Sequence, residues 1–293
     1  MRWYEDWVRR KLPLVLLVIG IVTLLVLRLV VRVSATPDLP KISQLNAEEF
    51  RAFSVWATSF AGLMIALMWA AIVAASIAKQ YLSKKGYRCA LIISGVSALV
   101  TAVLSRLLWN ERDLLAIVER ARSIPIRSVT LVGNSLAVGS AALVVGACIA
   151  LATSSRVPPL AELRRRVAES RLLLFSAAVF LVVGVAEIYM VFQLPIAVEK
   201  TRIGVDMPKV LQHMTGSITL LAGVWYTAVL LILFVPVAVV HEKWVDDVWQ
   251  SGGGQKHSEW LESAGLHRSI GSTASQLVAA AAPLLAALGL TPS

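Results

Sequence analysis

The sequence predicts an all-α, polytopic integral membrane protein with six transmembrane helices, and three observations lead to this fold class. Hydrophobic residues make up 57% of the 293 residues, and the mean hydropathy is +0.73. Apolar runs of transmembrane length recur along the chain, and in lipid such runs form helices because every backbone polar group needs an internal partner. Basic residues alternate between richer and poorer connections, which is typical of a chain that crosses a membrane repeatedly.

Six apolar runs are long enough to cross a hydrocarbon core of roughly 30 Å, given a helical rise of about 1.5 Å per residue. They lie at residues 13–33, 55–78, 89–109, 129–153, 172–194 and 217–240. Val-Ser-Ala at 33–35 resembles a signal-peptide cleavage site. Arg28 and Arg32 stand between the apolar stretch and that site, so we expect the first run to remain as a spanning helix. Residues 1–12, which precede it, are amphipathic and predict a short helix on the membrane surface.

Basic residues predict the orientation of these helices. The connections at 1–12, 79–88, 154–171 and 241–293 carry 16 of the 28 Lys and Arg residues, whereas those at 34–54, 110–128 and 195–216 carry 9. The positive-inside rule therefore places the first set, with both termini, in the cytoplasm. We expect the protein in the plasma (inner) membrane, in contact with the lipid bilayer.

Two outer connections predict short helical extensions beyond the membrane. Asn46 and Glu49 have the spacing of a capping box, so the second helix should begin about five residues before its apolar part. The third helix should continue through residues 110–124 until Pro125 ends it.

The sequence divides into a transmembrane domain, residues 1–240, and a cytoplasmic tail, residues 241–293. The tail has a Gly-rich joint and then an apolar helix at 274–290, interrupted by Pro283. We expect this helix to dock under the bundle or against a neighbouring subunit. A re-entrant segment or a seventh span is the alternative, and a seventh span would place the C-terminus outside.

Small residues recur every four positions on two helices, which lets neighbouring backbones approach closely. This helix-packing or oligomer face consists of Gly62, Ala66, Ala70, Ala74 and Ala78 on the second helix and Ala142, Gly146 and Ala150 on the fourth. Ordinary packing within one bundle is the first interpretation, and a subunit interface is the second.

A polar cluster is predicted near the outer face of the membrane. Arg28, Arg106 and Glu187 lie 16 to 18 residues beyond the last inner basic residue of their helices, or roughly 24 to 27 Å. Asn134, Ser135 and Gln193 fall in the same layer by the same count. A carboxylate at this depth needs a cationic partner, Arg28 or Arg106, if the role is structural. The functional interpretation is an outward-facing vestibule or ion-contact site.

Two classes of function remain after composition and motifs are considered. The net charge of +10 comes from basic residues scattered as membrane anchors, so nucleic acid is not an expected partner. The two cysteines and four histidines form no metal or catalytic motif, so we expect no enzyme, metal or cofactor. The favoured function is a channel or transporter subunit, and we expect it to act as a homo-oligomer or with membrane-complex partners. The alternative is a non-conducting or signal-gated effector or scaffold of a multi-protein assembly.

Overall fold

The computed structural model describes residues 47–107, 126–153, 157–199, 207–251, 260–261 and 270–290, and all regular structure within them is helical. The helices are α2 (Ala47–Tyr81), α3 (Lys84–Leu107), α5 (Ile126–Ala152), α6 (Leu160–Glu199), α7 (Met207–Ser251) and α9 (Ile270–Leu290). Five of them, α2, α3, α5, α6 and α7, are long and apolar enough to cross a membrane. The predicted class, an all-α multi-pass membrane protein, is confirmed. The first predicted span, 13–33, and the surface helix, 1–12, lie outside the described residues.

Three helices extend beyond the apolar runs that the sequence predicts. The described part of α2 starts at Ala47, eight residues before its apolar run, and the predicted cap residue Asn46 lies outside the described residues. α6 begins twelve residues before its apolar run, and α7 continues eleven residues past its own. These two extensions pack on each other through Leu163 and Trp244, so tertiary contacts stabilise turns that lie outside the apolar pattern. The predicted extension at 110–124 lies outside the described residues.

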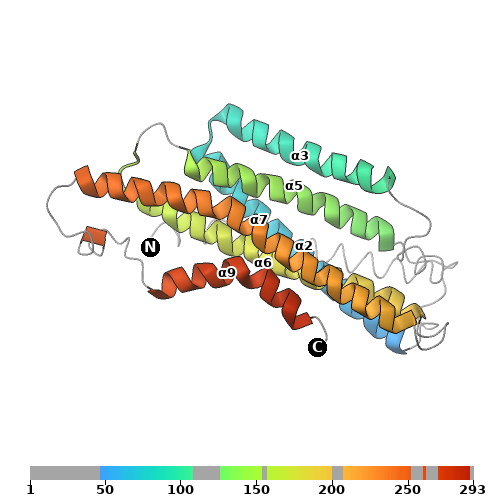
Figure 1. Ribbon diagram of the computed structural model, residues 1–293. Coiled ribbons are helices and arrows are strands. Elements are labelled where there is room, and N and C mark those ends of the chain that lie inside the picture. The colour runs from blue at the N-terminus through green and yellow to red at the C-terminus, as the bar shows by residue number, and fades with distance from the viewer. Residues whose placement is uncertain are drawn as a thin grey trace.

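The helices form one elongated bundle (Figure 1). α2 packs against α5 and α6, and α7 packs against α5 and α6. α3 lies at the edge of the bundle, mainly against α5. There the Ser94 hydroxyl donates a hydrogen bond to the Gly139 carbonyl at 2.7 Å. α9 lies on the other side, against α6 and α7.

The bundle has two ends, which differ in charge. One end, called the basic end below, is formed by residues 79–88, 157–171 and 241–251. The opposite end, called the far end, is formed by residues 47–60, 126–133, 187–199 and 207–219. Contacts at Gln80 with Glu169, and at Gly62 with Val183, fix the antiparallel register of α2 and α6 between these ends.

The main core lies in the half of the bundle next to the basic end and includes residues of five helices. Leu151, Leu173 and Leu230, from α5, α6 and α7, are fully buried there. Ala74 of α2 and Ala279 of α9 complete the same core. The small-residue face of α2 is therefore used inside the chain, where Ala70, Ala74 and Ala78 have no exposed surface.

α9 lies beside the spanning part of α7 and contacts its backbone closely. A Cβ atom added at Gly223 of α7 would lie 2.5 Å from the Cβ of Ala287 and 2.9 Å from the Pro283 carbonyl oxygen. The Leu284 amide donates a hydrogen bond to the Thr227 hydroxyl at 3.2 Å. α9 is visibly bent along its length (Figure 1), consistent with a proline inside the helix. The apolar C-terminal segment therefore packs within its own chain beside the spanning part of α7, which differs from the expected position under the bundle.

Candidate functional site

The far end of the bundle holds a buried carboxylate, Glu187 of α6. Its side chain is 4% exposed, and its Oε1 atom accepts no hydrogen bond within the described part of the chain. The indole of Trp56 from α2 and the phenol of Tyr226 from α7 are its polar neighbours. A buried carboxylate without full hydrogen bonding is costly inside a membrane, which marks the position as a candidate functional site.

Four more buried polar atoms in the described residues lack a hydrogen-bond partner and share this end of the bundle. They are Trp56 Nε1, Ser59 Oγ, Thr130 Oγ1 and Thr219 Oγ1. Together with Glu187 they come from α2, α5, α6 and α7. We call these five residues the orphan layer.

Contacts between the helices place these residues at similar depth. Trp56 belongs to the apolar cluster of Val191 and packs near Val129, the residue before Thr130. Gly184 contacts Tyr226, and α7 runs opposite to α6, so Thr219 is level with Val191. Val191 is one helical turn from Glu187. The orphan layer therefore spans only one to two turns of the bundle.

The hydroxyl groups of this layer differ from others in the chain. Thr58, Thr101, Ser135, Thr153 and Ser176 each donate a hydrogen bond to the backbone carbonyl four residues earlier. This is the usual way in which a helical hydroxyl is satisfied in a membrane. The hydroxyls of Ser59, Thr130 and Thr219 make no such bond. Buried polar atoms of this kind are normally satisfied by water or by an ion.

The other residues of the predicted polar cluster are placed as follows. Ser135 is buried on α5 and donates to the Leu131 carbonyl at 2.8 Å, and Gln193 is half-buried on α6 beyond Glu187. Asn134 is exposed on α5. Arg28, and the side chain of Arg106 on α3, lie outside the described residues. An ion pair between Glu187 and either arginine therefore stays a prediction.

The predicted packing face lies between helices of this chain. Gly62 of α2 faces Val183 of α6, and Ala66 and Ala70 form a cluster with Phe180 of α6. On α5, Ala150 is buried and Gly146 faces Ala90 of α3. These contacts are the close helix approaches that small residues allow.

A second group of polar residues lies on the same helix as Glu187, toward the basic end. The Trp69 indole of α2 donates a hydrogen bond to the Ser176 hydroxyl at 3.0 Å. Glu169, which is 1% exposed on its side chain, accepts hydrogen bonds from Arg165 at 3.1 Å and from Gln80 at 3.3 Å. Glu169 and Glu187 are about 27 Å apart along the axis of α6. The region between them contains the buried apolar side chains of Leu173 and Phe180.

Arg166 joins four helices at the basic end. Its Nη1 atom donates to the carbonyls of Ala150, Leu151 and Thr153 at 3.5, 3.3 and 3.1 Å, and its Nη2 atom donates to Glu162 at 2.8 Å. Its guanidinium lies 4.4 Å from the ring centre of Tyr81 of α2 and 5.4 Å from that of Trp244 of α7. Arg166 therefore caps the C-terminal end of α5 by donating to its last carbonyls, and its guanidinium stacks on two aromatic rings.

Glu169, Arg166 and His241 are not among the site residues that the sequence predicts, and His241 is one of four histidines without a motif. The available signal was the pair of four-residue spacings, Glu162 with Arg166 and Arg165 with Glu169, which the structure uses as ion pairs.

Comparisons with protein-family models, with curated proteins and with solved structures found no match to this chain. Among the described residues, no group of three or more His, Cys, Asp or Glu side chains is placed to hold a metal ion. The orphan layer therefore offers one carboxylate and three hydroxyls. This donor set suits a proton or a small monovalent cation better than a divalent metal, which favours several carboxylates.

Proposed function

We propose that the protein moves a small cation across the plasma membrane, as a channel or transporter subunit, and that Glu187 is the carboxylate that binds it. The observation that carries this proposal is the orphan layer. Five buried polar atoms at similar depth, on four helices, lack a hydrogen-bond partner. They cost stability unless water satisfies the Trp56 indole and water or a cation satisfies the four oxygen atoms. A carboxylate in such a layer attracts a cation from the aqueous side nearest to it.

The apolar side chains between Glu187 and Glu169 would block a cation path in the described conformation. Leu173 and Phe180 separate the two buried carboxylates, so the described conformation would be closed. Conduction would then need a shift of α2 against α6, with the Trp69–Ser176 hydrogen bond halfway along the path. Two buried carboxylates on either side of an apolar barrier are compatible with alternating access.

The experiment is a flux measurement in proteoliposomes that contain the purified full-length protein. Proton flux is followed with a pH-sensitive dye inside the vesicles, and sodium and potassium are tested as separate imposed gradients. We expect flux of at least one of the three cations, and we expect Glu187→Gln to reduce it by about tenfold or more. Glu48→Gln is the matched control, because it removes the same charge from an exposed residue at the far end. Flux that is equal in Glu187→Gln and the unsubstituted protein would contradict the proposal.

The alternative, a non-conducting effector or scaffold, is supported by a different observation. α3 packs mainly on α5 and exposes large apolar residues, among them Ile92, Leu99 and Leu107. Gly95 on this helix has open space beside it, so a helix of a second copy could approach closely. If α3 forms a homo-oligomer interface, Gly95→Leu should disrupt it, and the protein should then have a smaller molecular mass in detergent. An unchanged mass would mean that this face of α3 contacts lipid and not a second copy.

A further inference from the structure

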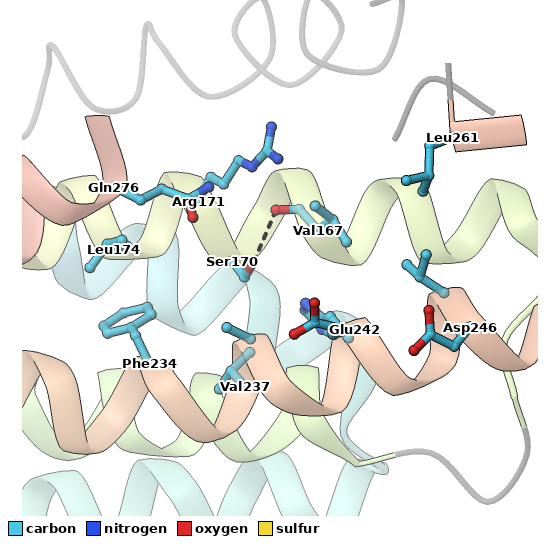
Figure 2. A pocket seen from close by; sticks show the side chains of 13 residues that line it. Val167, Ser170, Arg171, Leu174, Phe234, Val237, Glu242, Asp246, Leu261 and Gln276 are labelled. Atoms are coloured by element: carbon cyan, nitrogen blue, oxygen red, sulfur yellow. Dashed lines mark hydrogen bonds between the residues drawn. The ribbon is translucent and has the colours of Figure 1, made fainter. Parts of the chain in front are cut away.

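A cavity of about 260 Å³ lies near the basic end, between α6, α7 and α9. Figure 2 shows Leu174 and Phe234 toward one end of it, and Glu242, Asp246 and Leu261 toward the other. The cavity is separate from the orphan layer, which lies at the far end of the same helices. Its volume is below the range of roughly 300 to 1,000 Å³ that is usual for sites enclosing a whole drug-sized ligand.

The lining changes from apolar to charged at the point where the spanning runs end. Leu174 and Phe234 belong to the apolar runs of α6 and α7, whereas Arg171 and Glu242 lie just outside those runs. In a bilayer this boundary coincides with the headgroup layer. The cavity therefore has the polarity gradient of a phospholipid, with hydrocarbon on one side and charge on the other.

The charged part of the wall carries both signs. Arg171 of α6 supplies a guanidinium, the group best suited to hold a phosphate through two hydrogen bonds. Glu242 and Asp246 of α7 are four residues apart, so both carboxylates lie on one face of the helix. The Ser170 hydroxyl, which donates to the Val167 carbonyl at 2.9 Å, keeps its acceptor capacity (Figure 2). All three charged side chains also interact elsewhere in the chain.

We propose that this cavity binds the headgroup of a phospholipid with a primary amine, of the phosphatidylethanolamine class. Arg171 receives the phosphate, and Glu242 with Asp246 receives the ammonium group. The acyl chains lie outside the cavity, along the exposed apolar side chains of Val235 and Val239 of α7. A quaternary amine cannot donate hydrogen bonds, and a glycerol headgroup has no positive charge. Phosphatidylcholine and phosphatidylglycerol therefore bind less tightly. This inference does not depend on the proposed cation transport.

The test measures lipid binding to the full-length protein in detergent by native mass spectrometry. Phosphatidylethanolamine, phosphatidylcholine and phosphatidylglycerol of the same acyl chains are added in competition. For the unsubstituted protein we expect the ethanolamine lipid to be favoured by about tenfold, the factor that a hydrogen bond to a charged group contributes. Arg171→Gln should weaken all three lipids to a similar degree. The double variant Glu242→Gln with Asp246→Asn should bring the ethanolamine lipid to the level of the choline lipid.

Matched controls separate these effects from a change in net charge or in folding. Arg164→Gln and Asp247→Asn alter the same charges on α6 and α7, at positions that do not line the cavity. Ala238→Phe fills the cavity and leaves its charges in place, so it should lower binding of all three lipids. The ratio between lipids is read within one sample, so partial unfolding does not change it.

Three results would overturn the proposal. The first is equal binding of the three lipids to the unsubstituted protein. The second is an equal loss of ethanolamine preference in Asp247→Asn and in the double variant. The third is competition by free phosphoethanolamine at the same concentration as the lipid, which would indicate a soluble ligand instead of a membrane one.

Discussion

Arg166 of α6 donates a hydrogen bond to the carbonyl oxygen of Leu151, at 3.3 Å, near the C-terminal end of α5. The same carbonyl is 3.2 Å from Nε2 of His241 of α7, which must carry the proton because a carbonyl only accepts. The last carbonyls of a helix have no partner within it, and the helix dipole makes that end negative. A buried cation from one neighbouring helix and an imidazole from another satisfy this end of α5.

The first prediction is that Arg166→Gln destabilises the protein strongly. The substitution removes the guanidinium that donates to the last carbonyls of α5, and it also removes the cationic partner of Glu162. We expect a loss of about 2 to 3 kcal/mol in the free energy of unfolding, because the buried guanidinium hydrogen bonds to the α5 carbonyls are lost and hydrogen bonds to charged groups contribute about 1.5 to 3 kcal/mol. Thermal unfolding in one detergent measures it. Arg164→Gln, on the exposed side of the same helix, is the control and should change stability by less than about 1 kcal/mol. Equal losses in the two variants would mean that Arg166 does not hold the helices together.

The second prediction is that α9 needs the glycine at 223. Gly223→Ala places a Cβ atom where Ala287 and the Pro283 carbonyl already lie, so α9 must move away from α7. We expect a loss of about 1 to 3 kcal/mol, as for other overpacked contacts. Adding Ala287→Gly removes the tightest of these contacts and should recover part of the loss. Gly95→Ala introduces the same methyl group into open space on α3 and should be neutral or slightly stabilising. If the two alanine variants melt alike, α9 is not packed on α7 as described.

The third prediction concerns a cationic partner for Glu187. If Arg28 or Arg106 pairs with it, the stability losses of Glu187→Gln and the corresponding arginine variant are not additive, because each removes the same interaction. Thermal stability of Glu187→Gln, Arg28→Gln, Arg106→Gln and the two double variants decides between them. Ile188→Ala is the neighbouring control and should cost less than Glu187→Ala. Additive losses in both double variants would exclude a pair and leave water or a cation to satisfy the carboxylate.

The fourth prediction is that the basic end faces the cytoplasm. Single cysteines at Ser43, Ser123 and Lys209 should react with an impermeant thiol reagent added outside intact cells. Cysteines at Ser83 and Ser155 should react only after the membrane is opened. The background variant has alanine in place of Cys89 and Cys148, because Cys89 is exposed. Labelling of Ser83 but not of Ser43 from outside would reverse the topology.

The helical membrane class and the positions of α2, α3, α5, α6 and α7 followed from the sequence by itself. Apolar length is a local property, since any run long enough to cross the hydrocarbon core must satisfy its backbone as a helix. Glu187 was also recognisable from the sequence, because a carboxylate inside an apolar run is conspicuous wherever the run packs.

Only the tertiary structure decided which polar groups meet. The orphan layer contains Ser59, Thr130 and Thr219, whose hydroxyls are unremarkable in sequence because most helical hydroxyls bond to their own backbone. Their shared depth depends on the register of four helices. Arg166 and Leu151 lie on different helices, so no sequence spacing predicts their contact. α9 can lie against α7 because Gly223 has no side chain at the point of contact. A helix that is apolar on every side, as α7 is through most of its span, carries no pattern that fixes its rotation, so these contacts are set by packing between helices.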